Sequence, residues 1–370
     1  MEKSSKPIVL LGEARGENEA RIGSNFVGAS GIELLRMLND AGLLILTSED
    51  NSYIHKFYST GDPNQIEMVW RLHPELHRTN VLNFRPPGNS LESLCGPKAE
   101  GIPGFPSLTK SKYLRKEFSP ELERLADELV EKDPNLILCL GNAALWALCG
   151  TTGISKLRGT TRISTHTATG FKVLPTYHPA AVLRQWELRP VVIRDFIKAI
   201  KEKEYPDVRR PRREIWIEPS LDDVQEFYKS HIVGCRLLSV DIETAGDQVT
   251  CIGFSPSPER ALVIPFFDFR KRNRSYWPTL SDEREAVRWC AKINGDPEIM
   301  KLFQNGMYDI AFLWRSLHMP VFGAMEDTML AHHALQPESL KGLGFLGSVY
   351  TDEGPWKVER KKTSTIKKDE

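Results

Sequence analysis

Short apolar runs alternate with helix-like periodic segments through the first half of the chain. The runs at 6–11, 135–140 and 172–176 have the length and continuous apolar character of strands that are buried on both faces. Helical patterns occupy 31–43 and 119–132, the second opening with Ser-Pro-Glu, a typical helix start. This alternation predicts an α/β domain with a mostly parallel sheet, whose ligands gather at the carboxyl ends of the strands.

The second half has a different order of elements. A strand at 214–218 and a helix over 220–231 come first. Three strand-like runs follow at 236–242, 249–254 and 260–266, and their short connections predict an antiparallel meander. Three helices are then expected, around 281–293, 306–317 and 326–335.

The length of 370 residues suits two domains, and an apolar fraction of 41% allows each its own core. The segment EYPDVRRPRR at 204–213 is charged, contains two prolines and has no apolar period, which is typical of a linker. Its arginines suit a solvated tether and a phosphate-contacting strip equally well. We therefore expect a first domain over 1–203, a linker over 204–213, a second domain over 214–356 and a flexible tail over 357–370.

Charge and cysteine content narrow the class of protein only slightly. Lys+Arg and Asp+Glu both number 49, and a nucleic-acid enzyme needs only local positive charge, so net charge decides nothing. The six cysteines form no CxxC pair and several lie in apolar runs, which predicts reduced thiols in an intracellular protein. No stretch approaches the roughly 20 apolar residues of a membrane span. We expect a cytoplasmic, nucleoid-associated protein of a bacterium or phage-infected cell, with no membrane partner.

Four polar segments of the first half follow predicted strands. They are GEARG at 12–16 with GSNFVGASG at 23–31, TNVLNFRPPGN at 79–89, GN at 141–142, and YHPAAVLR at 177–184. Singly, each has an ordinary alternative, since Glu13 suits a loop acid, Phe26 a core aromatic and His178 a turn. Together they resemble the uracil-DNA glycosylase superfamily over about 6–200, and especially its thermostable iron–sulfur branch. That branch carries GEAPG…PFVG…AG, an asparagine before CRPPGN, and a late HP motif.

The resemblance implies a three-layer α/β/α domain with two catalytic residues. Hydrolysis of an N-glycosidic bond builds positive charge on the sugar and negative charge on the departing uracil. Glu13 would stabilise the cation and position a water, and His178 would donate a hydrogen bond to the uracil carbonyl as the anion develops.

Four further residues would bind the substrate by the same resemblance. Asn80 would pair with the Watson–Crick edge of uracil, and Phe26 would stack on the flipped base. Gly12 would let the backbone approach the nucleotide closely. Arg184 suits a phosphate contact or a solvated side chain equally.

The chain departs from the iron–sulfur branch in two respects. Arg15 stands where the branch has the proline of GEAPG, and a cation beside Glu13 is expected to lower the pKa of that carboxyl. Phe84 stands where the branch has the CRPP cysteine, and the N-terminal cysteine pair is missing. Because Cys95 alone cannot hold an iron–sulfur cluster, we predict no cluster.

Acidic residues also punctuate the second half. The segment SVDIETAG ends an apolar strand with Asp241 and Glu243, whose side chains point the same way and can share a cation. Such a pair alone is more typical of surface acids. Asn305 and Asp309 then lie four residues apart at a helix start, and Asp327 opens DTMLAHHAL.

In series these segments resemble the DEDD, or DnaQ-like, 3'–5' exonuclease domain of family A DNA polymerases over about 214–356. The resemblance implies an RNase H-like α/β domain that binds Mg²⁺ or Mn²⁺ through Asp241, Glu243 and Asp309, with Asn305 positioning the scissile strand and Asp327 structural. The family's last motif, a Tyr or His shortly before an Asp ligand, has no counterpart at the right spacing. We therefore expect a domain incomplete at its C-terminus, with impaired activity.

Three functions follow from these patterns. The leading hypothesis is a DNA replication and repair enzyme that excises uracil or a related base from DNA. The alternative is a non-catalytic module that binds uracil or DNA and is attached to a polymerase proofreading domain. The third is a proofreading nuclease with a structural front domain. The expected partners are single-stranded or uracil-containing DNA and a DNA polymerase domain or subunit.

Overall fold

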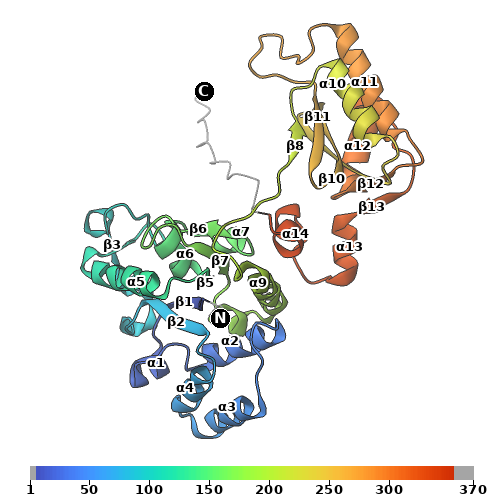
Figure 1. The fold of residues 1–370 in the computed structure, drawn as a ribbon. Coiled ribbons are helices and arrows are strands. Elements are labelled where there is room, and N and C mark those ends of the chain that lie inside the picture. The colour runs from blue at the N-terminus through green and yellow to red at the C-terminus, as the bar shows by residue number, and fades with distance from the viewer. Residues whose placement is uncertain (1–5, 354–370) are drawn as a thin grey trace. The chain divides into compact units, whose positions relative to one another are not determined.

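The computed structural model describes residues 6–353, which fold into two compact units (Figure 1). Of the described residues, unit 1 contains 6–209 together with 344–353, and unit 2 spans Arg210–Leu343. Within the described part of the chain, no helix has both the length and the apolar character needed to cross a membrane.

A five-stranded sheet in the order β2-β1-β5-β7-β6 forms the centre of unit 1. Its strands are β1 (Ile8–Ala14), β2 (Leu76–Leu82), β5 (Leu136–Leu140), β6 (Arg162–Ile163) and β7 (Lys172–Thr176). All neighbours are parallel except β6, which runs antiparallel to β7. β5 and β7 are buried throughout, as the continuous apolar runs predict. β1 continues past the predicted end at Leu11, so Gly12 and Glu13 belong to the strand.

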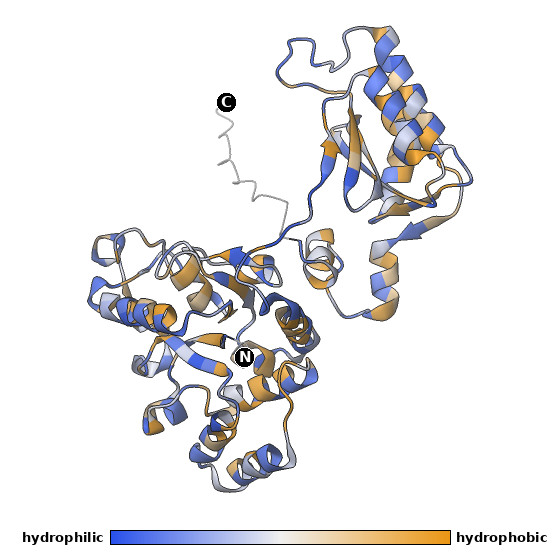
Figure 2. Ribbon diagram, in the orientation of Figure 1, coloured by the Kyte–Doolittle hydropathy of each residue, from blue (hydrophilic) through white to orange (hydrophobic). Residues whose placement is uncertain are grey.

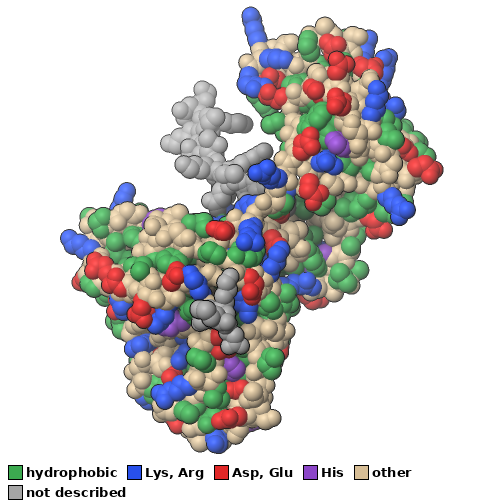
Figure 3. Space-filling model, in the orientation of Figure 1, with side chains coloured by type: hydrophobic (Ala, Val, Ile, Leu, Met, Phe, Trp, Pro, Cys, Tyr) green, Lys and Arg blue, Asp and Glu red, His purple; other side chains and the backbone are tan. Residues whose placement is uncertain are grey.

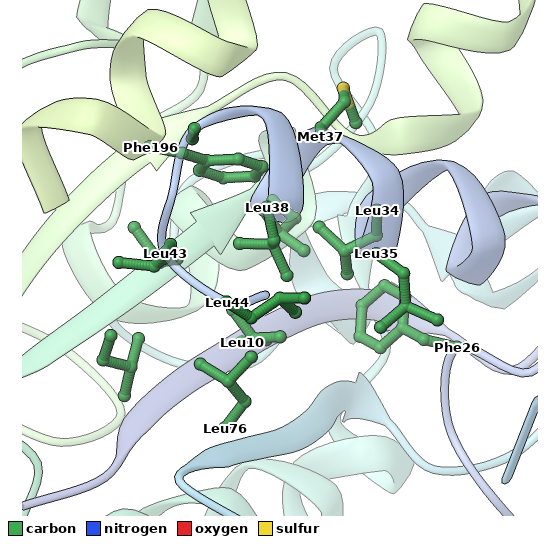
Figure 4. Close-up of a cluster of buried hydrophobic side chains, with 14 of the residues drawn as sticks. Leu10, Phe26, Leu34, Leu35, Met37, Leu38, Leu43, Leu44, Leu76 and Phe196 are labelled. Atoms are coloured by element: carbon green, nitrogen blue, oxygen red, sulfur yellow. The ribbon is translucent and has the colours of Figure 1, made fainter. Parts of the chain in front are cut away.

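Helices cover both faces of this sheet, which confirms the three-layer α/β/α architecture. Alternate residues of β1 enter different cores, because successive side chains of a strand point to opposite faces. Leu10 packs in one apolar cluster with α2 (Ala29–Asp40) and α9 (Arg189–Glu202), as Figure 4 shows for its contacts with α2. Leu11 packs in the other cluster, with α5 (Ser119–Lys132) and α6 (Asn142–Cys149). Most of these helices carry both apolar and polar residues, as Figure 2 shows.

The smaller elements of unit 1 lie outside the predicted set. They are α1 (Glu17–Ile22), α3 (Ser48–Thr60), α4 (Asn64–Arg71), β3 (Cys95–Gly96), β4 (Tyr113–Leu114), α7 (Ile154–Leu157) and α8 (Pro179–Arg184). α3 shows why pattern alone misses such helices, since Asp50 and Ile54 are its only buried residues. Its start is instead defined by a capping box between Thr47 and Asp50.

Unit 2 has a six-stranded sheet in the order β13-β12-β9-β10-β11-β8. The strands are β8 (Glu214–Trp216), β9 (Leu237–Ala245), β10 (Gln248–Ser257), β11 (Arg260–Pro265), β12 (Met300–Phe303) and β13 (Met325–Asp327). β9, β10 and β11 form the predicted antiparallel meander, and β12 and β13 add in parallel to β9. A central strand flanked by a meander on one side and two parallel strands on the other is the RNase H-like topology, as expected.

Unit 2 has four helices, and the first three pack with this sheet around one apolar core. The four are α10 (Leu221–Phe227), which continues into a π-helical turn over Tyr228–Ile232, α11 (Leu280–Asn294), α12 (Gly306–Leu317) and α13 (Thr328–Leu335). Each lies within a residue or two of a predicted helix, except that the predicted start at 326 is the strand β13.

The last described helix, α14 (Leu343–Tyr350), joins unit 1 from Gly344 onward. The Arg158 guanidinium donates to Ser348 Oγ at 2.8 Å, and Lys198 Nζ donates to the Ser348 carbonyl at 2.6 Å. Unit 2 therefore ends earlier than the predicted boundary at 356, because a buried arginine of unit 1 holds α14. No helix or strand falls between Lys203 and Arg213, where a linker is expected. The predicted tail at 357–370 lies outside the described residues.

Candidate active site

A cavity of about 260 Å³ lies in unit 1 beside the carboxyl ends of β1 and β7. Its lining includes Glu13, Phe26, Asn80, His178 and Arg184. The sequence separates these five residues by up to 171 positions, and the fold brings all of them to one cavity.

The register between two strands places the first part of the site. Gly12 of β1 pairs with Asn80 of β2. Glu13 follows Gly12 directly, so the register brings the carboxyl of Glu13 and the amide of Asn80 to neighbouring positions of the sheet. A Cβ atom at Gly12 would lie 2.2 Å from Asn80 Oδ1 and 2.5 Å from Phe26 Cζ. The missing side chain of Gly12 thus leaves room for the amide of Asn80 and the ring of Phe26. The close approach of the Gly12 backbone to a nucleotide stays a prediction.

Glu13 keeps its proton more readily than an exposed glutamate. Burial raises the pKa of the Glu13 carboxyl, and the nearby Arg184 guanidinium opposes that shift. The expectation that Arg15 lowers the pKa of Glu13 is therefore wrong. Arg15 turns elsewhere, and its Nε donates to Asn25 Oδ1 at 3.1 Å.

His178 is held as a neutral imidazole. It caps the N-terminus of α8, where its Nδ1 accepts a hydrogen bond from Ala180 N at 3.1 Å. Burial lowers the pKa of His178 to about 4, and Arg184 acts in the same direction. Because Nδ1 accepts, the remaining proton of the neutral ring sits on Nε2, which is then a hydrogen-bond donor.

Phe26 belongs to the apolar core, as its ordinary interpretation has it, and it also lines the cavity. Its ring stacks on that of His178 with centroids 6.1 Å apart and an interplanar angle of 29°. The backbone of Phe26 has φ 58°, an uncommon value for a residue with a side chain. Trp70 Nε1 donates to the Phe26 carbonyl at 2.8 Å, and a Cβ at Gly31 would lie only 1.8 Å from that oxygen. These contacts fix the ring in the cavity.

In unit 2 the predicted acids are only partly brought together. Asp241 and Glu243 are exposed on β9 while Val240 and Ile242 are buried, as strand alternation predicts. Asp309 Oδ1 accepts from Ile242 N at 3.1 Å. Burial raises the pKa of Asp309 to about 6, and the nearby Asp241 carboxylate adds to the shift.

These acids do not form a metal site in the structure. Among residues 6–353, no three His, Cys, Asp or Glu side chains converge closely enough to hold one metal ion. The assignment of Asp241, Glu243 and Asp309 as ligands of Mg²⁺ or Mn²⁺ stays a prediction, and no chemical step is assigned to a metal.

Asp327 has the structural role expected of it. Its carboxylate accepts from the backbone N–H groups of Asn305, Gly306, Met329 and Leu330 at 2.8–3.4 Å. These bonds join β13 to the starts of α12 and α13. Asn305 precedes α12 with a left-handed backbone, φ 63°.

Residues 2–201 match the family model of the uracil DNA glycosylase superfamily, which is just over half of the chain. The chain belongs to the uracil-DNA glycosylase superfamily. Among its relatives, the Type-4 uracil-DNA glycosylase of Archaeoglobus fulgidus is 31% identical over 201 residues, covering 52% of this chain and 74% of that one. The Sulfurisphaera tokodaii Type-4 enzyme is 28% identical over 207 residues, covering 54% and 72%.

Similar solved structures are much more distant. The complex of Trypanosoma brucei RNase D with RNA U12 matches at 16% identity and a TM-score of 0.27, over 34% of this chain and 40% of that one. The EXD2 exonuclease domain soaked in Mn and GMP matches at 14% identity and a TM-score of 0.25, over 36% and 68%. The chain thus spans well under half of that RNase D, and the RNase H-like description of unit 2 depends on its strand order.

An aromatic contact occupies the position of one cluster cysteine of the glycosylase family's iron–sulfur branch. The ring of Phe84 lies 5.7 Å from that of Phe118 at an interplanar angle of 30°, and both pack against an apolar core. Cys95 is buried, and its Sγ lies 3.3 Å from the Leu91 carbonyl. All six cysteines are free thiols. The absence of a cluster stays a prediction.

Several residues of the glycosylase cavity were not predicted. Glu19, Ser30 and Asn89 also line it. Glu19 Oε1 accepts from the backbone N–H groups of Val27 and Gly28 at 3.1 and 3.0 Å, which holds the loop that carries Phe26. Asn89 ends the RPPGN segment and was within reach of motif reading, whereas nothing in the pattern around Glu19 marks it.

Proposed function

We propose that unit 1 is a DNA glycosylase that excises uracil, or a closely related base, from DNA. The observation that carries the proposal is the convergence of a carboxylate, a neutral imidazole, an amide and an aromatic ring on one cavity. Membership of the uracil-DNA glycosylase superfamily and the Type-4 relatives support it.

The chemistry assigns each side chain one task. A flipped base stacks on Phe26, and the amide of Asn80 pairs with its Watson–Crick edge. As the C1'–N1 bond breaks, its electron pair moves onto uracil, and His178 Nε2–H donates to the carbonyl oxygen where that charge develops. Water adds its oxygen to C1' and gives one proton to the Glu13 carboxylate, which also stabilises the cationic sugar.

A single-stranded DNA carrying one uracil tests this proposal. Base release is scored on a gel after alkaline cleavage of abasic sites. We expect release by the native protein, and a loss of roughly 100-fold or more in His178→Ala and in Glu13→Gln, as for removal of an oxyanion donor or a general base. The exposed His55→Ala is the matched control and should keep the native rate.

The outcome also separates the glycosylase from a binding module. Tight binding to uracil DNA without base release would favour the non-catalytic alternative. No release beyond the His178→Ala level would remove the glycosylase proposal.

For unit 2 we propose an RNase H-like module whose metal-dependent 3'–5' exonuclease activity is impaired, with Asn305 left to position a DNA strand. Among the described residues, no three His, Cys, Asp or Glu side chains group as metal ligands, which supports this. With Mg²⁺ or Mn²⁺, we expect the native protein to shorten a 5'-labelled single strand no faster than Asp241→Ala does. Metal-dependent shortening that Asp241→Ala abolishes would overturn the proposal.

We further propose that the chain works in the cytoplasm beside a DNA polymerase. The DIET, NGMYD and DTMLAHHAL segments, which resemble a polymerase proofreading domain, support the partner, and six free thiols suit a reducing compartment. Co-purification of a polymerase with the tagged full chain from nuclease-treated cells is the test, and its absence would count against the partnership.

A further inference from the structure

The base-reading amide of Asn80 is held by a side chain that no motif marks. Asn80 Nδ2 donates to Asn25 Oδ1 at 3.1 Å, and Arg15 Nε donates to the same oxygen at 3.1 Å. On the other side, Asn25 Nδ2 faces two acceptors, the Arg78 carbonyl at 3.4 Å and Asn83 Oδ1 at 3.3 Å. With donors on one side and acceptors on the other, the amide of Asn25 fits in one orientation only.

The surroundings of Asn25 keep this arrangement rigid. Asn25 is only 8% exposed, and Arg78 NH1 donates to its backbone carbonyl at 2.7 Å. The Arg78 guanidinium also lies over the ring of Trp70, 5.0 Å from its centroid. Arg15 is a permanent donor, because a guanidinium stays protonated at any working pH.

The fixed Asn25 in turn fixes Asn80. Asn25 Oδ1 can only accept, so it must meet the Nδ2 side of the Asn80 amide. Asn80 Oδ1 then points the other way, toward the space beside Gly12, where a Cβ would lie 2.2 Å from it. Asn80 therefore offers the cavity one acceptor and one remaining N–H, in a set order.

That order matches one pyrimidine and mismatches another. Uracil has an N3–H donor next to an O4 acceptor, whereas cytosine has an N3 acceptor next to an amino donor. An Asn80 amide with a fixed orientation pairs with uracil. Against cytosine it sets donor against donor and acceptor against acceptor. Leaving a buried polar group unpaired in this way discriminates strongly between substrates.

We propose that Arg15 and Asn25 are positioning residues that lock the Asn80 amide and so select uracil over cytosine. The inference rests on the proposed function of the cavity. Arg15 stands at the position of the proline in GEAPG and Asn25 at that of the proline in PFVG, so two residues that differ from the branch's motifs meet in one hydrogen bond.

Binding to uncleavable DNA tests the lock without requiring catalysis. Two single strands carry one 2'-fluorinated deoxyuridine or deoxycytidine at the same site, and their dissociation constants give a uracil-to-cytosine preference. We expect Asn25→Ala and Arg15→Met to lower that preference about tenfold, as for a hydrogen bond to a buried polar group. Asn25→Asp should keep only part of the preference, because its carboxylate still accepts from Arg15 and Asn80 but sets an oxygen against the Arg78 carbonyl. The exposed Asn51→Ala is the matched control.

The outcomes separate this inference from the proposed function. A general loss of structure would raise the dissociation constants of both strands equally. Thermal melting identifies a variant that does not fold, and if Asn25→Ala is such a variant, Arg15→Met decides. An unchanged preference in folded Asn25→Ala and Arg15→Met overturns the lock, even if the native protein releases uracil. A native protein that prefers the uracil strand, loses this preference in the variants and releases no base would sustain the lock and remove the glycosylase.

Discussion

Burial disfavours the charged forms of Glu13 and His178, two of the titratable side chains that line the cavity. It raises the pKa of Glu13 and lowers the pKa of His178 to about 4. Arg184 opposes the first shift and reinforces the second. At neutral pH this one cation therefore favours an anionic carboxylate beside a neutral imidazole, which is the pairing that the proposed hydrolysis needs.

Removing Arg184 should move the pH dependence of base release. In Arg184→Ala the pKa of Glu13 rises further, so the carboxylate is protonated, and activity lost, at a higher pH than in the native protein. Single-turnover rates from about pH 4.5 to about pH 8 measure this acid limb. Arg71→Ala, an exposed arginine paired with Glu67, is the control. A uniform loss of rate without a shift of the limb would assign Arg184 to DNA contact alone.

His178 should also make the fold acid-sensitive. Its folded pKa, about 4, lies below the usual value of 6.5, so the unfolded chain binds the proton more readily. Stability should fall as the pH drops from about 6.5 toward about 4, by at most about 2 kcal/mol at pH 5. Urea unfolding of the native protein and of His178→Gln at about pH 7 and about pH 5 measures this, and the variant should lose less. Equal losses in both proteins would contradict the shift.

Gly12 should tolerate no side chain. The Cβ of Gly12→Ala would push against Asn80 Oδ1 and Phe26 Cζ, so the amide and the ring would have to move. We expect base release to fall about 10-fold to 100-fold, from roughly 1–3 kcal/mol of overpacking in the site. Gly342→Ala, where nothing lies within 4 Å and the backbone is not left-handed, serves as a control for rate. A native rate in Gly12→Ala would show that Asn80 and Phe26 can move aside without loss of activity, which would contradict this prediction.

Among the elements, α14 depends most on a distant partner. Arg158 and Asp195 are both 0% exposed at their side chains and form an ion pair, in which Arg158 Nε donates to Asp195 Oδ2 at 2.8 Å. Thr176 Oγ1 also donates to Asp195 Oδ2, at 2.6 Å, and Arg158 reaches Ser348 of α14. A buried pair of this kind tolerates the loss of one partner poorly, because the other charge is left uncompensated.

Arg158→Met should destabilise unit 1 by about 3–5 kcal/mol, the usual cost of a buried charge without its partner. Adding Asp195→Leu should recover much of that loss, since the uncompensated carboxylate is gone. Urea unfolding followed by tryptophan fluorescence measures both. A double variant as unstable as the sum of the single changes would contradict the coupling.

For the whole molecule, unit 1 is built from two separate stretches of chain. Residues 344–353 belong to it although all of unit 2 lies between them and Arg209 in sequence. Acidic and basic side chains are interspersed on the visible faces of both units, in keeping with the equal totals of 49 (Figure 3). The two stretches of unit 1 are joined by individual contacts, such as the hydrogen bonds that Arg158 and Lys198 donate to Ser348.

A single cut in the linker should therefore leave the molecule together. With a specific protease site inserted after Arg210, cleavage gives two fragments, and α14 keeps the second one bound to unit 1. We expect the fragments to co-elute in gel filtration and to separate in denaturant. The same cut in Arg158→Met should release more of the second fragment. Fragments of the native protein that separate without denaturant would contradict this arrangement.

The sequence by itself determined the larger elements and most of the polar residues that line the cavity. Continuous apolar runs predicted β5 and β7, short connections predicted the meander of unit 2, and motif letters predicted Glu13, Asn80 and His178. These features are local, because periodicity and turn residues act within a few positions of one another.

Only the tertiary structure decided how those residues act on one another. It turned Arg15 away from Glu13 and onto Asn25, brought Asp309 to the backbone of Ile242 between Asp241 and Glu243, and placed α14 in unit 1. The direction of a side chain, the burial that shifts a pKa and the partner of a helix all depend on contacts between segments far apart in the chain. Packing of the whole fold sets those contacts, so no local pattern contains them.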